Sequence, residues 1–362
     1  MNDVSQGMND GGSENERQPI GRLKFVTFLA ITLVPVFLLL SVGWYWYSAT
    51  YFPFLIGDEL SHRAWELTYV ERKQVLPVTG VRDGEGVAWS PHRSLGWIQT
   101  RSELPGKTNI DEEGIQHFSP ATEPTHRILI IGGSVAYGTD VTSLSATYFH
   151  RLGVELGNSN LICEIDVFAT SGWKSIQEIR ALELYCATHA NPDLIIFIDG
   201  LNDLTNGANA SSLHSQRTIT KDGSEWTPLY HEHDYSARVN RYLQNMHLAW
   251  EFATDRDIVT LILLQPALFE KNPKSLIESR LLTNSLLPHK SEDALRDSYA
   301  SMRSGLELLA ARDNLWFLDG SRLFNGESAT TFVDIWHFSE FGHIILAEAL
   351  APKVIDILKS RP

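Results

Sequence analysis

Short apolar runs alternate with helical patterns over residues 127–362. Five runs are short and rich in β-branched residues, as buried strands are, and they cover Ile128–Ile131, Leu161–Phe168, Leu194–Ile198, Ile258–Leu264 and Leu315–Leu318. Between and after these runs, apolar residues recur at helical spacing near Ser145–Leu156, Ser175–His189, Ser236–Thr254, Glu292–Ala311 and Ser339–Leu358. Strands that alternate with helices predict an α/β fold, a three-layer α/β/α domain whose middle layer is a five-stranded parallel sheet.

The chain before these runs has different patterns. Residues 1–24 are polar and predict a disordered tail. Residues 25–47 contain an unbroken apolar stretch without charges, and as a helix they would measure about 35 Å, which is enough to cross a bilayer. Aromatic residues fill positions 44–47, as is typical of a membrane interface. We therefore predict an uncleaved transmembrane helix. A cleaved signal peptide is the alternative, although its apolar core is usually shorter.

Positive charges lie mainly before this apolar segment. Arg17, Arg22 and Lys24 precede it, whereas only Arg63 follows within about 20 residues, the range over which the positive-inside bias is counted. This asymmetry predicts a single-pass membrane protein whose N-terminus is cytoplasmic and whose main domain is periplasmic or otherwise extracytoplasmic. Residues 48–126 contain many Gly and Pro residues and predict a stalk and a loop-rich segment that packs against the main domain.

Composition narrows the class of partner. The chain has 362 residues and a formal net charge of −14, with no run of Lys or Arg. Nucleic acid is therefore not expected as a partner, because it would call for a basic surface. Cys163 and Cys186, the only cysteines, form either one disulfide in an exported domain or two buried thiols. His92, His117 and His126 have no partners at metal-ligand spacing, so we expect surface histidines and no metal.

One apolar run leads directly to a candidate nucleophile. Ile128–Ile131 is followed by Gly132 and Gly133, which permit a tight turn, and then by Ser134. A serine at the carboxyl end of a parallel strand lies where open α/β sheets bind their ligands. The turn alone allows two interpretations, a catalytic serine or a serine that caps the next helix.

Residues near other strand ends supply the partners that a nucleophilic serine needs. Asp334 and His337 precede the last helix, where His337 could take the serine proton while Asp334 holds its other ring nitrogen. Gly172 follows the second strand and offers a backbone N–H, and Asn202 follows the third and offers a side-chain NH₂. Each residue is ordinary by itself. Together they favour a nucleophilic serine, because parallel strands end at one edge of the sheet.

Four blocks of the sequence resemble the SGNH hydrolases, also called GDSL-type esterases and lipases. In chain order the blocks are Gly132–Gly138, Gly172, Gly200–Asp203 and Asp334–His337. The resemblance covers about residues 127–358 and implies a flavodoxin-like fold. It further implies that Ser134 is the nucleophile and that Asp334 and His337 complete the triad. Such a reaction needs no cofactor, and none is expected.

The resemblance also implies an oxyanion hole, made by the Ser134 and Gly172 N–H groups and the Asn202 side chain. One departure is Gly133, which stands where the family has the aspartate of G-D-S. That aspartate is not the triad acid, so only local hydrogen bonding is expected to differ. The stretch Ser94–Trp97 is similar to one in membrane-anchored bacterial members of the family.

These observations predict a serine esterase that hydrolyses O-acyl esters, with O-acetyl esters as the favoured class. The ester would be carried by a small molecule or by an envelope or exported polysaccharide. Two alternatives stay open: an O-acyltransferase that uses a glycan hydroxyl as acceptor, and a non-catalytic envelope protein on a hydrolase scaffold. The same triad serves hydrolysis and transfer, so the motifs do not separate them. Trp173, Trp226, Trp336 and the polar insertion at 205–235 either line the substrate site or pack. The sequence does not indicate an oligomeric state.

Overall fold

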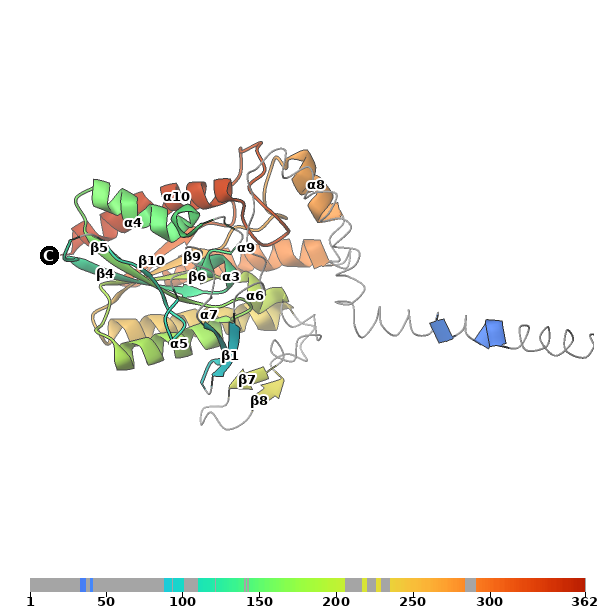
Figure 1. The fold of residues 1–362 in the computed structure, drawn as a ribbon, viewed down its shortest axis with the longest axis horizontal. Helices are drawn as coiled ribbons and strands as arrows, with labels where there is room; N and C mark the ends of the chain where they lie inside the picture. The colour runs from blue at the N-terminus through green and yellow to red at the C-terminus, as the bar shows by residue number, and fades with distance from the viewer. Residues whose placement is uncertain are drawn as a thin grey trace, which may run out of the picture. The chain divides into compact units, whose positions relative to one another are not determined.

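A computed structural model describes most of the chain after residue 87. The described residues are 33–36, 40–41, 88–92, 94–100, 110–120, 122–139, 141, 143–205, 217–219, 226–228, 235–283 and 291–361. The chain divides into two units, Met1–Pro53 and Phe54–Pro362. The second unit holds every element that follows (Figure 1).

A six-stranded mixed sheet forms the centre of this unit, in the order β10-β9-β6-β4-β5-β3. Its strands are β3 (Gln116–Phe118), β4 (His126–Gly132), β5 (Cys163–Ala169), β6 (Leu194–Asp199), β9 (Val259–Leu264) and β10 (Leu315–Asp319). All neighbouring pairs are parallel except β3 and β5, which are antiparallel. The parallel strands, numbered along the chain, have the order 2-1-3-4-5, which is flavodoxin-like.

The prediction of five parallel strands is therefore correct for those strands and incomplete for the sheet. The sixth strand, β3, consists of Gln116, His117 and Phe118. Three residues, two of them polar, leave no apolar run that periodicity could detect.

Helices cover both faces of the sheet (Figure 1). They are α4 (Tyr148–Asn158), α5 (Ser175–Thr188), α7 (Tyr235–Thr254), α9 (Ser291–Leu309) and α10 (Glu340–Ser360). Alternate residues of β4 face the two layers: Ile128 and Ile130 pack with α4 and α10, whereas Leu129 and Ile131 pack with α5, α7 and α9. Every residue of that alternation is fully buried. A strand covered on both sides is continuously apolar, so the apolar run in the sequence is enough to predict β4.

Smaller elements lie around this core. They are the hairpins β1 (Ala88–His92) with β2 (Gly96–Thr100) and β7 (Arg217–Ile219) with β8 (Trp226–Pro228), and the short helices α3 (Ser134–Tyr137), η1 (Leu144–Ala146), α6 (Leu201–Thr205) and α8 (Leu276–Thr283). The turn of the first hairpin is fastened to the main domain. Leu95 is fully buried in the core, and its carbonyl accepts a 2.8 Å hydrogen bond from Gln177 Nε2.

The edge strand β3 is held by a histidine between two carboxylates. His117 Nδ1 lies 2.7 Å from Asp166 Oδ1, and its Nε2 lies 3.1 Å from Asp111 Oδ2. The hydrogen bond to Asp166 raises the pKa of His117 to about 9, although partial burial opposes the rise. The His117 side chain keeps 29% of its surface exposed, but its two carboxylate partners were not expected, because one is distant in sequence and the other is irregularly spaced.

Most of the N-terminal predictions fall outside the described residues. Of the predicted transmembrane helix at 25–47, the structure describes only 33–36 and 40–41, which are helical. In the part of the chain that is described, no helix is both long and apolar enough to span a bilayer. The tail at 1–24 is not among the described residues.

Candidate active site

Ser134 lies on a tight turn between β4 and α3. The strand ends at Gly132, where a Cβ atom would lie 2.3 Å from the carbonyl oxygen of Ile198, so only glycine allows this close approach of β4 to β6. The helix runs from Ser134 to Tyr137 and is capped by Gly138, whose φ of 80° is left-handed. The turn therefore places Ser134 just beyond the carboxyl edge of the sheet.

The hydroxyl of Ser134 meets a histidine from the far end of the chain. His337 Nε2 lies 2.8 Å from Ser134 Oγ, and His337 Nδ1 lies 2.7 Å from Asp334 Oδ2. Both distances are within hydrogen-bond range. The structure thus brings the three predicted residues together in the order Ser, His, Asp.

The surroundings of Asp334 favour its ionised form. One carboxylate oxygen, Oδ1, accepts hydrogen bonds from the backbone N–H groups of Trp336 (2.6 Å) and His337 (2.7 Å), and the other accepts from the His337 ring. Burial raises the pKa of Asp334, but the His337 ring and these hydrogen bonds outweigh it, so the pKa lies below its usual value. An ionised Asp334 fixes the His337 tautomer with its proton on Nδ1, which leaves Nε2 as the acceptor for the Ser134 hydroxyl.

The two predicted oxyanion donors follow the strands on either side of β4: Gly172 follows β5, and Asn202 lies in α6, after β6. Gly172 has a φ of 80° in a turn that the Trp173 N–H closes on the Thr170 carbonyl (3.1 Å). The Asn202 Nδ2 donates to the Trp173 carbonyl (2.9 Å). A Cβ atom on Gly133 would lie 2.3 Å from this same Nδ2. The Asn202 amide therefore lies against the residue before Ser134, and the lack of a side chain at Gly133 leaves room for it.

Buried polar groups join α6, which carries Asn202, to the start of α5. Asp203 accepts hydrogen bonds from the backbone N–H (3.0 Å) and the hydroxyl (2.6 Å) of Ser175, the first residue of α5. Burial raises the pKa of Asp203 to about 6, and the nearby Asp199 adds to the rise. Asp199 itself accepts from the Tyr242 hydroxyl (2.7 Å). The segment from Asp199 to Asp203, which carries Asn202, is thus anchored at both ends. The short turn motif in the sequence does not indicate these contacts.

Three further side chains bind the backbone of α3 and of the segment that follows it. Gln116 Nε2 donates to the Tyr137 carbonyl (2.9 Å), and the Tyr148 hydroxyl donates to the Ala136 carbonyl (2.6 Å). His343 Nε2 donates to the carbonyl of Thr139 (3.1 Å). Burial lowers the pKa of His343 to about 4, so the ring is neutral at physiological pH.

The predicted aromatic lining receives little support. Trp173 has no exposed surface and packs edge-to-face on Phe168, so it is a core residue. Trp336 is half-buried beside Asp334, whereas the Trp226 side chain and most of 205–235 lie outside the described residues. Both cysteines are free thiols: Cys163 is buried in β5 and Cys186 is half-buried in α5.

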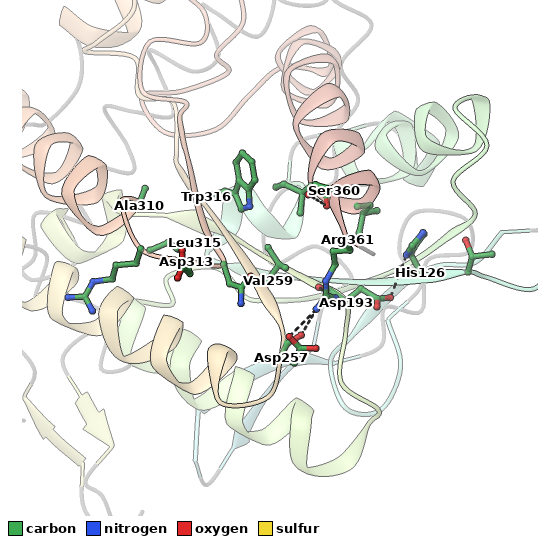
Figure 2. Close-up of a pocket in the computed structure, with 15 residues that line it drawn as sticks. His126, Asp193, Asp257, Val259, Ala310, Asp313, Leu315, Trp316, Ser360 and Arg361 are labelled. Atoms are coloured by element: carbon green, nitrogen blue, oxygen red, sulfur yellow. Dashed lines mark hydrogen bonds and ion pairs between the residues drawn. The ribbon is translucent and has the colours of Figure 1, made fainter.

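A hollow of about 790 Å³ lies at the other edge of the sheet, where β4, β9 and β10 begin (Figure 2). Within it, Arg361 forms ion pairs with both Asp193 and Asp257. This hollow is separated from Ser134 by the length of the strands. Among the described residues, no cluster of His, Cys, Asp and Glu has the geometry to hold a metal ion.

Solved structures resemble this chain, although no family model and no curated protein sequence matches it. A member of the lipolytic G-D-S-L family from Veillonella parvula is 16% identical, with 64% of this chain and 98% of that chain covered and a TM-score of 0.44. An acetylxylan esterase from Geobacillus stearothermophilus is 15% identical, with 64% and 94% covered and a TM-score of 0.40.

Proposed function

We propose that the chain is a serine esterase that cleaves O-acyl esters through Ser134, His337 and Asp334. The observation that carries the proposal is the continuous relay of hydrogen bonds from Ser134 Oγ through both ring nitrogens of His337 to Asp334. A helix-capping serine would need no histidine on its hydroxyl, and α3 has no side-chain cap. The relay is the arrangement that activates a serine for acyl transfer.

The chemistry follows from the atoms in contact. Ser134 Oγ attacks the ester carbonyl while its proton passes to His337 Nε2, and Asp334 stabilises the resulting imidazolium. The developing oxyanion is held by the Asn202 amide with the Gly172 and Ser134 N–H groups. His337 then returns the proton to the departing alkoxide, which leaves an acyl-serine. Water then attacks the acyl carbon while His337 takes its proton, and His337 returns this proton to Ser134 Oγ as the acyl–oxygen bond breaks and the acid leaves.

The acceptor in the second half of the reaction decides between an esterase and an acyltransferase. We favour water, with an O-acetylated polysaccharide as the substrate class. We also propose that residues 25–47 anchor the chain and that the main domain is extracytoplasmic, because charge flanks the apolar segment asymmetrically.

Two measurements test the proposal. The purified full-length chain should hydrolyse p-nitrophenyl acetate, and Ser134→Ala should abolish the activity. Equal turnover by the variant would refute the nucleophile assignment. Mass spectrometry with an acetylated polysaccharide, with and without an acceptor glycan, should detect free acetate in both cases. Acetyl transfer to the glycan in place of acetate release would identify a transferase.

A further inference from the structure

The loop that carries Asp334 and His337 is closed like a small hairpin. The Ser339 N–H donates to the Thr331 carbonyl (2.8 Å), and the Val333 N–H donates to the His337 carbonyl (2.9 Å). Phe332 and Phe338 form an antiparallel bridge between the two arms. The position of His337 on the second arm therefore depends on where the first arm lies.

A buried glutamate from a distant helix holds the first arm. Glu278 Oε1 accepts hydrogen bonds from the Thr331 N–H (2.8 Å), the Thr331 hydroxyl (3.0 Å) and the Phe332 N–H (3.2 Å). The Glu278 side chain is fully buried. Three donors on one carboxylate oxygen fix the arm at the point where it pairs with the His337 arm.

The local helix cap does not account for these contacts. Ser275 and Glu278 form a capping box at the start of α8, in which Ser275 Oγ accepts from the Glu278 N–H (3.2 Å) and Glu278 Oε2 accepts from the Ser275 N–H (2.8 Å). Only Oε2 takes part in this cap. The other oxygen is directed to Thr331 and Phe332, which belong to no helix.

A buried lysine completes the arrangement. Lys271 Nζ lies 2.5 Å from Glu278 Oε2 and donates to the Ala329 carbonyl at 2.7 Å. The exposed fraction of its side chain is 1%. A buried ion pair often stabilises the folded state no more than an apolar pair of similar volume would, because both charges lose their hydration. Here both charged groups bind the segment that precedes Asp334.

We propose that Glu278, with Lys271 as its counter-ion, is a positioning residue for the Ser134 reaction. The inference rests on the proposed function. Its carboxylate holds the arm at Thr331–Phe332 so that His337 Nε2 remains within hydrogen-bond reach of Ser134 Oγ. Small displacements of a proton-transfer group lower the rate strongly, whereas they leave substrate binding nearly intact.

The test compares Glu278→Gln with a matched control. A glutamine side chain keeps one acceptor oxygen, so its NH₂ must face either the loop donors or Lys271 and Ser275. The control is Asp166→Asn, which disrupts another buried carboxylate with a cationic partner, at the β3 edge of the sheet. For Glu278→Gln in the full-length chain, we expect kcat for p-nitrophenyl acetate to fall at least tenfold with KM within twofold of wild type. Hydrogen exchange should rise in peptides that cover 329–338. Asp166→Asn should keep the wild-type kcat, even where it lowers Tm.

The outcomes separate this inference from the proposed function. Wild-type kcat and wild-type exchange at 329–338 in Glu278→Gln would overturn the positioning role. Equal losses of kcat in Glu278→Gln and Asp166→Asn would overturn it as well, because general destabilisation would then explain both. If the wild-type chain has no Ser134-dependent activity but Glu278→Gln alone raises hydrogen exchange at 329–338, Glu278 does hold the arm at Thr331–Phe332 and the proposed function fails.

Discussion

Asp334→Asn separates the electrostatic role of this side chain from its shape. Asp334 Oδ1 accepts two backbone N–H groups, at 2.6 and 2.7 Å, and Oδ2 accepts the His337 ring N–H at 2.7 Å. Asparagine has a single acceptor oxygen. If each hydrogen bond contributes about 1 kcal/mol, the orientation that keeps both backbone bonds is favoured by about that amount. The NH₂ group of the variant then faces His337 Nδ1.

This orientation reverses the His337 tautomer. Nδ1 must accept from the amide, so the ring proton moves to Nε2 and points at Ser134 Oγ. His337 can then no longer take the serine proton. In serine hydrolases the wrong tautomer lowers kcat by about 10⁴-fold, which corresponds to about 5 kcal/mol of transition-state stabilisation. We expect a loss of this size for Asp334→Asn, with Tm close to wild type because size and backbone hydrogen bonds are retained.

The assay is p-nitrophenyl acetate hydrolysis at pH 7–8, with Tm measured on the same samples. A kcat within tenfold of wild type, in a variant with wild-type Tm, would refute the tautomer argument and would make Asp334 a structural residue of the loop.

Two further predictions concern the turn before Ser134 and the β3 edge. Gly133→Ala should lower kcat about 100-fold with little change in KM, because the alanine Cβ would lie 2.3 Å from Asn202 Nδ2 and displace that donor. The backbone itself should not be strained, since the φ of −85° at this position suits alanine. Full activity of the variant would show that the Asn202 donor is not used. His117 has a folded-state pKa of about 9 against 6.5 unfolded, so its stabilisation is complete below pH 6.5 and is lost as pH rises through 9. The upper limit is about 3 kcal/mol, and about half of it should survive solvent screening of a side chain that is 29% exposed. Urea unfolding of wild type and His117→Asn should therefore differ more at pH 6 than at pH 9.5; a difference independent of pH would contradict this.

The parallel core was predictable because burial on both faces leaves continuous apolar runs. The run at Ile128–Ile131 marks β4, which extends it by two residues at the start and one at the end. The placement of Ser134, Gly172 and Asn202 beyond one edge of the sheet was also predictable, since all three follow parallel strands and such strands end at one edge. This placement depends only on the order of strands along the chain and on no particular side-chain contact.

Contacts that join distant segments through polar side chains were not predictable. The Ser275–Glu278 spacing is visible in the sequence as a capping box, but nothing in it indicates that Glu278 also binds Thr331, 53 residues away. The partner of His117 is likewise 49 residues away, on β5. Such pairs depend on which loops the fold brings together, and single residues carry no periodic signal for that.

We propose that Ser134 is a nucleophile activated by His337. A fluorophosphonate reacts covalently with such a serine, so intact-mass and peptide mass spectrometry of the labelled full-length chain test the claim most directly. We expect one adduct, located on Ser134, formed at least 100-fold more slowly in His337→Ala and absent in Ser134→Ala. An adduct on another residue, or equal labelling of wild type and Ser134→Ala, would contradict it.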